Sequence, residues 1–585
     1  FHNWSGNRVT CRDWFQLSLK EGFTVYRDSE FSADMGSRTV KRVEDVSFLQ
    51  TIQFAEDGGP MAHSVRPDSY MEISNFYTVT IYEKGAEVVR MIALLLGPEK
   101  FRAGSDLYFE RHDGRAVTTE DFVKSMEDAS GIDLGQFRNW YYQAGTPVVS
   151  IRSEFDSDNG RYTLHVSQHC PDTPGQSSKK PFTIPIRLGL LGSDGMDLPL
   201  KLLGEDASTS DTDRVLPLIE GEQQFVFEGL ESEPIPSLLR DFSAPVRVRY
   251  DYSRSDLLFL MVNDSDGFNR WNASQLLVIG LIDELQSDLA AGRELILPQS
   301  LVNAYAGVLD SVLSDASVDK AMVAQLLSLP TIGFLIERAE VANVEGIYFV
   351  REFLLNGVAA KFYSMFHDVY TNNTSDAEYA ADAESIARRS LKNLALSYLM
   401  RSDKDEAVML AQNQFVQAHN MTDQLSGLRC LVNSGAGAAV KLKRDALDSF
   451  YKQWCHEPLV VDQWFVAQAV CQLPGCLTQV KQLLEHVDFD IRNPNKVRSL
   501  IGAFCAQNHL AFHDASGEGY EFLADQVLAL DKLNPQVASR LLTPLTRWSK
   551  FSTKRQGLMQ AQLRRIKAES ELSKDLFEIV EKSTV

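Results

Sequence analysis

Two side chains near the start of the sequence, His2 and Glu21, are of types that bind zinc through an imidazole nitrogen and a carboxylate oxygen. Eighteen residues lie between them. Many proteins contain such a pair by chance, so the spacing alone does not identify a metal site. A third side chain, Tyr82, lies in a segment of helical periodicity, where spacing alone favours an aromatic residue packed in the core. The sequence that surrounds these three residues is more informative.

The first residues, F-H-N-W-S-G-N-R-V-T, and the later stretch W-F-Q-L-S-L-K-E-G resemble a zinc-peptidase pattern. This is the gluzincin pattern H-E-x-x-H-x18-E, entered one residue before its second histidine, in the form found in bacterial members of the aminopeptidase N family. The resemblance implies that His2 is the second zinc histidine and Glu21 the third zinc ligand. In the family, the two histidines share one face of a helix and the first is followed by the general-base glutamate.

In that pattern the first histidine and the general base precede the position of Phe1. A further family motif, G-x-M-E-N, which binds the α-amine of the substrate, is also not found in these residues. A catalytic zinc needs three protein ligands and an open position that activates water. We therefore expect that the sequence is a fragment that begins inside the zinc motif, and that it is inactive by itself. The intact enzyme is expected to bind one Zn²⁺.

The stretch from Tyr82 to Met91, Y-E-K-G-A-E-V-V-R-M, resembles the family pattern Y-x-K-G-A-x-V-x-R-M. The segment 60–67 is also similar to the family. In the family the tyrosine faces the zinc, which implies that Tyr82 is the electrophile whose hydroxyl donates to the oxyanion formed when water attacks the scissile carbonyl.

Three further residues have both a functional and a structural interpretation. Asp28 lies seven residues after Glu21, where it either orients a ligand imidazole or is a charge on a helix surface. Arg498 and Arg540 lie in two segments that resemble the family. They either line an interior passage and bind the C-terminal carboxylate of a peptide, or cap a helix or pair with a neighbouring acid.

Periodicity divides the chain into three predicted domains. Residues 1–146 are mostly helical, with a helix expected over 76–96, and by resemblance form part of a thermolysin-like catalytic domain. Alternating apolar residues and Gly-, Asp- and Ser-rich loops over 147–250 predict a β-sandwich. Residues 251–585 show successive helical stripes, which predict stacked helix pairs in a solenoid-like domain that ends in a charged amphipathic helix over 556–585.

Composition excludes several classes of protein. With 585 residues, 44% hydrophobic, the chain is expected to form three or four soluble domains. A net charge of −21 argues against a nucleic-acid surface, and no apolar run reaches the about 20 residues that span a bilayer. The seven cysteines are odd in number and scattered, which fits reduced thiols and a cytoplasmic, bacterial location. A bridge between Cys471 and Cys476, which flank a turn, is the minor alternative.

The resemblance covers essentially the whole chain. It implies a monomeric enzyme that removes N-terminal residues from peptides, with a broad preference for Ala, basic and large apolar side chains. Two alternatives differ from it in testable ways. A non-catalytic helical scaffold would have no reason to keep His2, Glu21 and Tyr82 together. A leukotriene hydrolase-like bifunctional enzyme shares the zinc pattern but lacks the β-sandwich predicted over 147–250.

Overall fold

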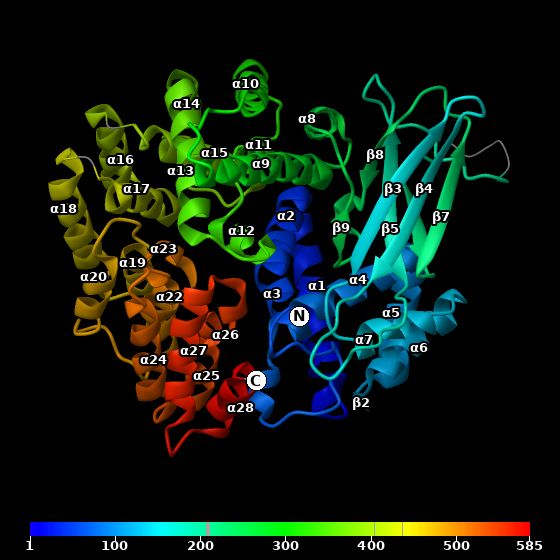
Figure 1. Ribbon diagram of the computed structural model, residues 1–585, viewed down its shortest axis with the longest axis horizontal. Coiled ribbons are helices and arrows are strands. Elements are labelled where there is room, and N and C mark those ends of the chain that lie inside the picture. Colours follow the sequence, from blue (N-terminus) through cyan, green and yellow to red (C-terminus); the bar gives the residue numbers. More distant parts are fainter. Residues whose placement is uncertain (206–210, 403, 436, 585) are drawn as a thin grey trace. The chain divides into compact units, whose positions relative to one another are not determined.

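The computed structural model describes residues 1–205, 211–402, 404–435 and 437–584. The chain divides into two compact units, Phe1–Leu277 and Val278–Val585, and the division falls within helix α9 (Gly267–Ala290). Helices come first along the chain, then a β-sandwich, then a long helical region (Figure 1). This order confirms the predicted fold class. None of the described helices is both long and apolar enough to cross a membrane.

The helical part of unit 1 contains short 3-10 and π segments, labelled η, between its α-helices. Its elements are β1 (Thr10–Cys11), η1 (Trp14–Gln16), α1 (Leu17–Met35), α2 (Arg38–Phe48), η2 (Leu49–Gln53), α3 (Phe54–Asp57), η3 (Ile73–Phe76), η4 (Thr80–Lys84), α4 (Gly85–Leu96), α5 (Pro98–His112), β2 (Ala116–Val117), α6 (Thr119–Ser130), η5 (Gln136–Arg138) and α7 (Asn139–Tyr142). The two-residue strands β1 and β2 pair in parallel.

The β-sandwich follows, and its two layers are visible in Figure 1. Its elements are β3 (Val148–Asp156), β4 (Arg161–His169), β5 (Ile184–Leu191), β6 (Arg214–Leu218), β7 (Glu222–Glu228), β8 (Ile235–Leu238), η6 (Arg240–Phe242) and β9 (Arg247–Arg249), followed by helix α8 (Arg254–Asn263). One sheet has the order β7-β4-β3-β9 and the other β6-β5-β8. All pairs are antiparallel except β3 with β9.

Alternation of side chains explains the sandwich. In β4, Tyr162, Leu164 and Val166 are buried, and in β7 so are Phe225 and Phe227, which lie opposite them in register. Because successive residues of a strand point to opposite faces, these side chains form one inner face and their polar neighbours face outward. The second sheet contributes buried aliphatic side chains from β5 and β6. The expected alternation is therefore observed in β4 and β7, whereas β5 is buried at nearly every position.

Unit 2 consists of helices throughout its described residues, arranged in sequence order from green to red in Figure 1. After α9 they are α10 (Gln299–Ser314), α11 (Lys320–Leu326), α12 (Ile332–Arg338), α13 (Val344–Lys361), α14 (Tyr363–Asn372), α15 (Ala383–Leu399), α16 (Asp405–Gln417), α17 (Met421–Asn433), α18 (Gly437–Trp454), α19 (Pro458–Ala469), α20 (Cys476–Leu483), α21 (Pro494–Val497), η7 (Arg498–Gly502), α22 (Ala503–Gln507), α23 (His509–Phe512), α24 (Glu518–Asp531), α25 (Pro535–Leu541), α26 (Thr543–Thr546), η8 (Trp548–Lys550), α27 (Thr553–Lys567) and α28 (Lys574–Ser583). Neighbours such as α14 and α15 or α16 and α17 pack as pairs.

One sequence-based expectation about this unit is corrected. The single helix expected over 556–585 is two helices, α27 and α28, because a tertiary contact starts a new helix at Ser573. The hydroxyl of Ser573 accepts from Leu576 N and donates to Asp531, which overrides the helical pattern. Cys471 and Cys476 are both buried free thiols, so the alternative of a bridge between them is not observed.

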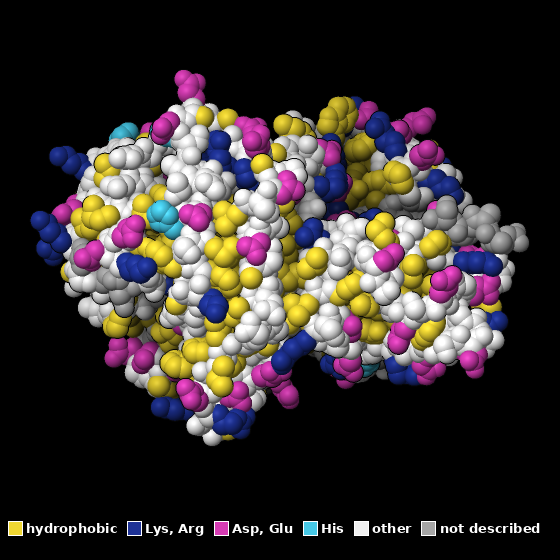
Figure 2. Space-filling model, turned by 90° about the horizontal axis from the view of Figure 1, so that it is seen from above, with side chains coloured by type: hydrophobic (Ala, Val, Ile, Leu, Met, Phe, Trp, Pro, Cys, Tyr) yellow, Lys and Arg dark blue, Asp and Glu magenta, His cyan; other side chains and the backbone are white. Residues whose placement is uncertain are grey.

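Charged side chains of both signs are interspersed on the face shown in Figure 2.

Helix α1 crosses the start of α4 at two glycines, Gly22 and Gly85. A Cβ atom on Gly22 would lie 2.6 Å from the carbonyl carbon of Gly85, so no larger residue fits without moving a backbone. Glu21 directly precedes Gly22, and η4, which carries Tyr82, directly precedes Gly85. The crossing therefore fixes the segment that holds Glu21 against the segment that holds Tyr82.

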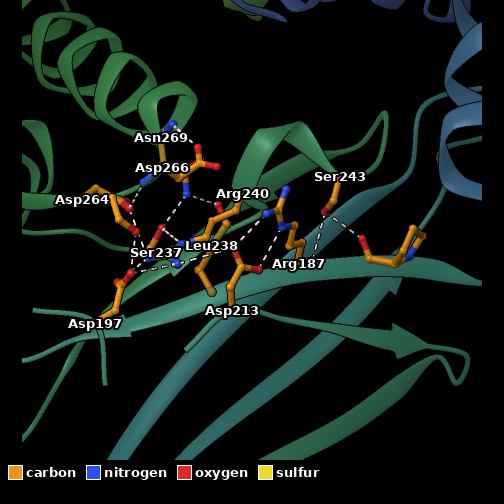
Figure 3. A network of polar contacts seen from close by, with 12 residues as sticks. Arg187, Asp197, Asp213, Ser237, Leu238, Arg240, Ser243, Asp264, Asp266 and Asn269 are labelled. Carbon is orange, nitrogen blue, oxygen red and sulfur yellow. Dashed lines mark hydrogen bonds and ion pairs between the residues drawn. The ribbon is translucent and has the colours of Figure 1, made fainter. Parts of the chain in front are cut away.

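A buried polar network lies where β5, β8 and the first turn of α9 meet (Figure 3). Arg240, 1% exposed, donates to Asp197 at 2.6 Å, to Asp264 at 3.2 Å and to Ser237 at 2.9 Å. Asn269 donates to Ser237 as well. Burial raises the pKa of Asp264 to about 6, against the hydrogen bond from Ser237 and the charge of Arg240, which lower it.

The network supports a strained turn. Leu239, Asp241 and Phe242 have φ values of 55°, 54° and 49°, in the left-handed region that costs non-glycine residues roughly 1 kcal/mol each. Arg42 of α2 donates to the carbonyls of Asp241 and Phe242. The same guanidinium forms a bidentate pair with Glu87 of α4, with both distances 2.7 Å. The turn thus ties the sandwich to the helices that carry the candidate site.

The raised pKa of Asp264 predicts a pH-dependent stability. The native state binds the Asp264 proton more tightly than the unfolded state, in which the pKa of this carboxyl group is near 3.8. The stabilisation that the bound proton gives to the native state is therefore complete below about pH 4 and is lost as the pH rises through about 6. Relative to Asp264→Asn, the wild-type free energy of unfolding should fall by about 3 kcal/mol between pH 4 and pH 7. Urea unfolding at several pH values measures this difference, and parallel curves for the two proteins would contradict it.

The glycine crossing predicts that Gly22→Ala destabilises the protein by about 2 kcal/mol or more, since the new methyl group meets backbone that cannot rotate away. Gly557→Ala is the matched control: this glycine is in the exposed part of α27 and its Cβ would meet nothing within 4 Å. Replacing it should raise stability by about 0.5–1 kcal/mol. Thermal unfolding of both variants separates steric conflict from helix propensity, and an unchanged Gly22→Ala protein would refute the crossing.

Candidate functional site

His2 and Glu21 lie close together although they come from different local structures. His2 belongs to a turn that precedes β1, and Glu21 belongs to the first turns of α1. The turn is closed by backbone hydrogen bonds from Asn7 N to His2 O and from Arg8 N to Asn3 O, both 3.0 Å.

The two side chains present one nitrogen and one oxygen to the same point. His2 Nε2 lies 3.3 Å from Glu21 Oε2, and Lys20 Nζ lies 3.1 Å from the other carboxylate oxygen. The side chain of Glu21 is 3% exposed, whereas that of His2 is 44% exposed. Tetrahedral zinc with bonds of about 2.0–2.1 Å separates neighbouring donors by about 3.3 Å. The observed distance between the nitrogen and the oxygen therefore suits a shared zinc ion.

The second ring nitrogen of His2 faces a hydroxyl group. His2 Nδ1 lies 3.5 Å from Thr24 Oγ1, and Thr24 donates its own proton to the carbonyl of Ser5 at 2.9 Å. Because the Thr24 oxygen is then an acceptor, the contact fits the tautomer with the proton on Nδ1. This tautomer leaves the Nε2 lone pair for a metal, an arrangement common among zinc histidines.

The donor types fit zinc, but the described residues supply two donors and not three. Within the part of the chain that the structure describes, no group of three or more His, Cys, Asp or Glu side chains is arranged to hold a metal ion. The pair His2 and Glu21 is thus a partial ligand set, to which further donors must be added before zinc binds tightly.

Tyr82 lies at the centre of the π-helical turn η4 and is half-buried. Its backbone N–H donates to Thr78 O at 3.2 Å, and Gly85 N closes the wide turn on Thr80 O. Periodicity predicted regular helix here. A π-turn carries one extra residue per turn and is frequently found at functional sites. The extra residue changes the direction in which Tyr82 leaves the helix.

Glu83, next to Tyr82, has a carboxyl group whose surroundings disfavour its charged form. Burial raises its pKa to about 7, and the charges of Asp45, Glu87 and Asp28 add to the shift. Asp28 is exposed on α1, and its charge acts on the carboxyl group of Glu83. The predicted role of Asp28 in orienting a ligand imidazole stays a prediction; the polar group at His2 Nδ1 is Thr24.

The two arginines singled out in the sequence belong to unit 2. Arg498 begins the π-helical turn η7 and Arg540 lies in α25, and both side chains are exposed. A Cβ atom on Gly502 of η7 would lie 4.0 Å from Leu541 Cδ1, so the two segments pack against each other. Their predicted contact with a peptide carboxylate stays a prediction.

Sequence reasoning missed Thr24 and Lys20, which hold His2 and Glu21 in place. Thr24 follows Glu21 by three residues and so shares its helix face. That spacing could have indicated that Thr24 lies beside the candidate site. The contact of Thr24 with His2 depends on the path of the preceding turn, which periodicity does not predict.

Each of the three regions of the chain matches a known protein family. Residues 1–141 match the Peptidase family M1 domain, residues 145–251 a domain of unknown function with an Ig-like fold, and residues 254–585 a domain of unknown function with ARM repeats. Aminopeptidase N of Escherichia coli (strain K12) is 44% identical over 584 residues, and that of Haemophilus influenzae is 42% identical over the same length.

Each of these alignments covers 100% of this chain and 65% of the relative, so the chain spans about two thirds of the length of the curated relatives. A solved structure, Legionella pneumophila aminopeptidase A in complex with aspartic acid, matches with a TM-score of 0.87 and 32% identity, over 100% of this chain and 64% of that one. The matched domains, the level of identity and the shared fold agree, and the chain belongs to the aminopeptidase N family of M1 peptidases.

Proposed function

We propose that this chain forms part of a zinc aminopeptidase that releases N-terminal residues from peptides, with His2 and Glu21 as two of the zinc ligands. The single observation that carries the proposal is the 3.3 Å separation of His2 Nε2 and Glu21 Oε2, because it matches the spacing of neighbouring zinc donors. Membership of the M1 family supports the same reaction class.

Zinc, when bound, lowers the pKa of a water molecule and polarises the scissile carbonyl. The residues of this chain have distinct tasks beside it. Glu21 supplies a buried carboxylate oxygen, while Lys20 holds the second oxygen of the same group. His2 supplies Nε2, oriented through Nδ1 and Thr24. Tyr82 donates its hydroxyl proton to the negative charge that develops on the carbonyl oxygen as water attacks.

The substrate class follows from the family and from charge. We propose a broad preference for N-terminal Ala, basic and large apolar residues, action on free peptides, a monomeric state and a cytoplasmic location. The net charge of −21 favours the approach of a cationic ligand, and the α-amino group of a peptide is one. Arg498 and Arg540 are proposed contacts for the opposite end of the peptide.

The 585 residues alone are expected to bind zinc weakly and to have no measurable turnover, since two donors and no general base are present among the motif residues. Zinc content after dialysis and hydrolysis of alanine p-nitroanilide measure both properties. One zinc per chain with turnover would contradict the expectation. The coding sequence upstream of Phe1 gives an independent check: it should encode His-Glu followed by one further residue before Phe1.

Replacing Tyr82 by Phe is expected to lower kcat by a factor of about 100 or more in the protein encoded by the complete gene, with zinc content unchanged, because an oxyanion donor acts mainly in the transition state. Tyr108→Phe is the control, since Tyr108 is a buried aromatic of α5 in the same unit. Steady-state kinetics decide: equal kcat values for the wild type and Tyr82→Phe would rule out the proposed role.

A further inference from the structure

We propose that Glu56 and Asp57 are positioning residues that set the direction of the Tyr82 hydroxyl. They do so by binding the two ends of the π-turn that carries Tyr82. This inference rests on the proposed function of Tyr82. The two acids are consecutive at the end of α3, and they contact the first and last residues of η4, Thr80 and Lys84. Tyr82 lies midway between these contacts.

At the first end of the turn, one carboxylate oxygen of Glu56 accepts two hydrogen bonds from Thr80. The backbone N–H of Thr80 lies 2.9 Å from Glu56 Oε1, and the Thr80 hydroxyl lies 2.5 Å from the same oxygen. Gln53 donates to the Thr80 hydroxyl at 3.2 Å. Gln53 is the last residue of η2, so the two π-turns of this region are joined at Thr80.

At the other end, Asp57 and Lys84 form an ion pair in which each side chain is 1% exposed. Lys84 Nζ lies 2.9 Å from Asp57 Oδ2 and also donates to Gly145 O at 2.7 Å. Thr146 donates its hydroxyl to the same aspartate oxygen at 2.8 Å. The Lys84 ammonium therefore has a fixed position shared by α3, η4 and the start of the sandwich.

The π-turn needs such external support. A wide turn closes on i→i+5 hydrogen bonds and is less favourable than a regular α-helical turn, so the surrounding structure must hold it. Both supports come from one short segment, Gln53–Asp57. A change at either acid releases one end of the turn and rotates its centre, where Tyr82 lies.

A small rotation is sufficient to affect chemistry. A misplacement of about 1 Å between a reacting atom and its donor lowers the rate about 100-fold. The negative charge on the carbonyl oxygen develops in the transition state and is absent from the bound substrate. Loss of the contacts from Glu56 or Asp57 should therefore lower kcat and leave KM almost unchanged. A purely structural role would instead lower the fraction of folded protein and leave the kinetics of the folded fraction as they are.

The Glu56 contact is tested by two variants of the protein encoded by the complete gene. Glu56→Ala removes the acceptor and should lower kcat about 10-fold or more with KM within threefold of wild type. Glu56→Gln keeps an oxygen at the same place for Thr80 and should restore kcat to within threefold. Equal kcat for Glu56→Ala and wild type would overturn the proposal, and so would a Gln variant as slow as the Ala variant.

The Asp57 contact is tested against a matched ion pair. Asp57→Asn should lower kcat about 10-fold or more. Asp423→Asn is the control, because Lys392 and Asp423 form an equally close buried pair at 2.7 Å within unit 2. Thermal unfolding of both variants shows whether their losses of stability are similar. A normal kcat for folded Asp57→Asn, or an equal fall in kcat for Asp423→Asn, would overturn the proposal.

A spectroscopic measurement on the 585-residue chain separates this inference from the proposed function. The chain has 18 tyrosines, so it is labelled with 3-fluorotyrosine and the Tyr82 resonance is assigned by Tyr82→Phe. We expect Asp57→Asn and Glu56→Ala to move or broaden that fluorine signal, and Asp423→Asn to leave it unchanged. An unmoved signal in both variants refutes the positioning role of Glu56 and Asp57. A moved signal, together with an inactive wild-type protein encoded by the complete gene, refutes the proposed function alone.

Discussion

The approach of α1 to the start of α4 at Gly22 and Gly85 is the constraint on which the candidate site depends. No side chain separates the two backbones there, since a Cβ on Gly22 would lie 2.6 Å from Gly85. Glu21 immediately precedes the first glycine, and the π-turn with Tyr82 immediately precedes the second. Glu21, the proposed zinc ligand, and Tyr82, the proposed hydrogen-bond donor, are 61 positions apart in the sequence and are held together by this crossing.

Buried charge surrounds this crossing and holds it in place. Arg42 joins Glu87 of α4 to the strained turn at Asp241 and Phe242, and Lys84 joins Asp57 to the carbonyl of Gly145. Removing one partner of such a pair costs about 3–5 kcal/mol, because the other charge stays buried without compensation. These buried ion pairs therefore join the helical part of unit 1 to the sandwich, in addition to the apolar packing between them.

The sequence predicted the fold class from the change of period alone, because a helical stripe and a two-residue alternation bury different residues. The family patterns around His2, Glu21 and Tyr82 predicted the candidate site, and the structure brings the side chains of His2 and Glu21 together. Periodicity could not predict the π-turn at Thr80–Lys84 or the new helix that starts at Ser573. Each of these is held by a tertiary contact, from Glu56 and Asp531 respectively, that no local pattern contains.

The central claim is that His2 and Glu21 bind one zinc ion together. The most direct test is a crystal structure of the protein encoded by the complete gene, with anomalous diffraction data collected on both sides of the zinc absorption edge. The account predicts one strong anomalous peak within about 2.2 Å of both His2 Nε2 and Glu21 Oε2. A zinc peak bound elsewhere, or a peak that touches neither side chain, would contradict it.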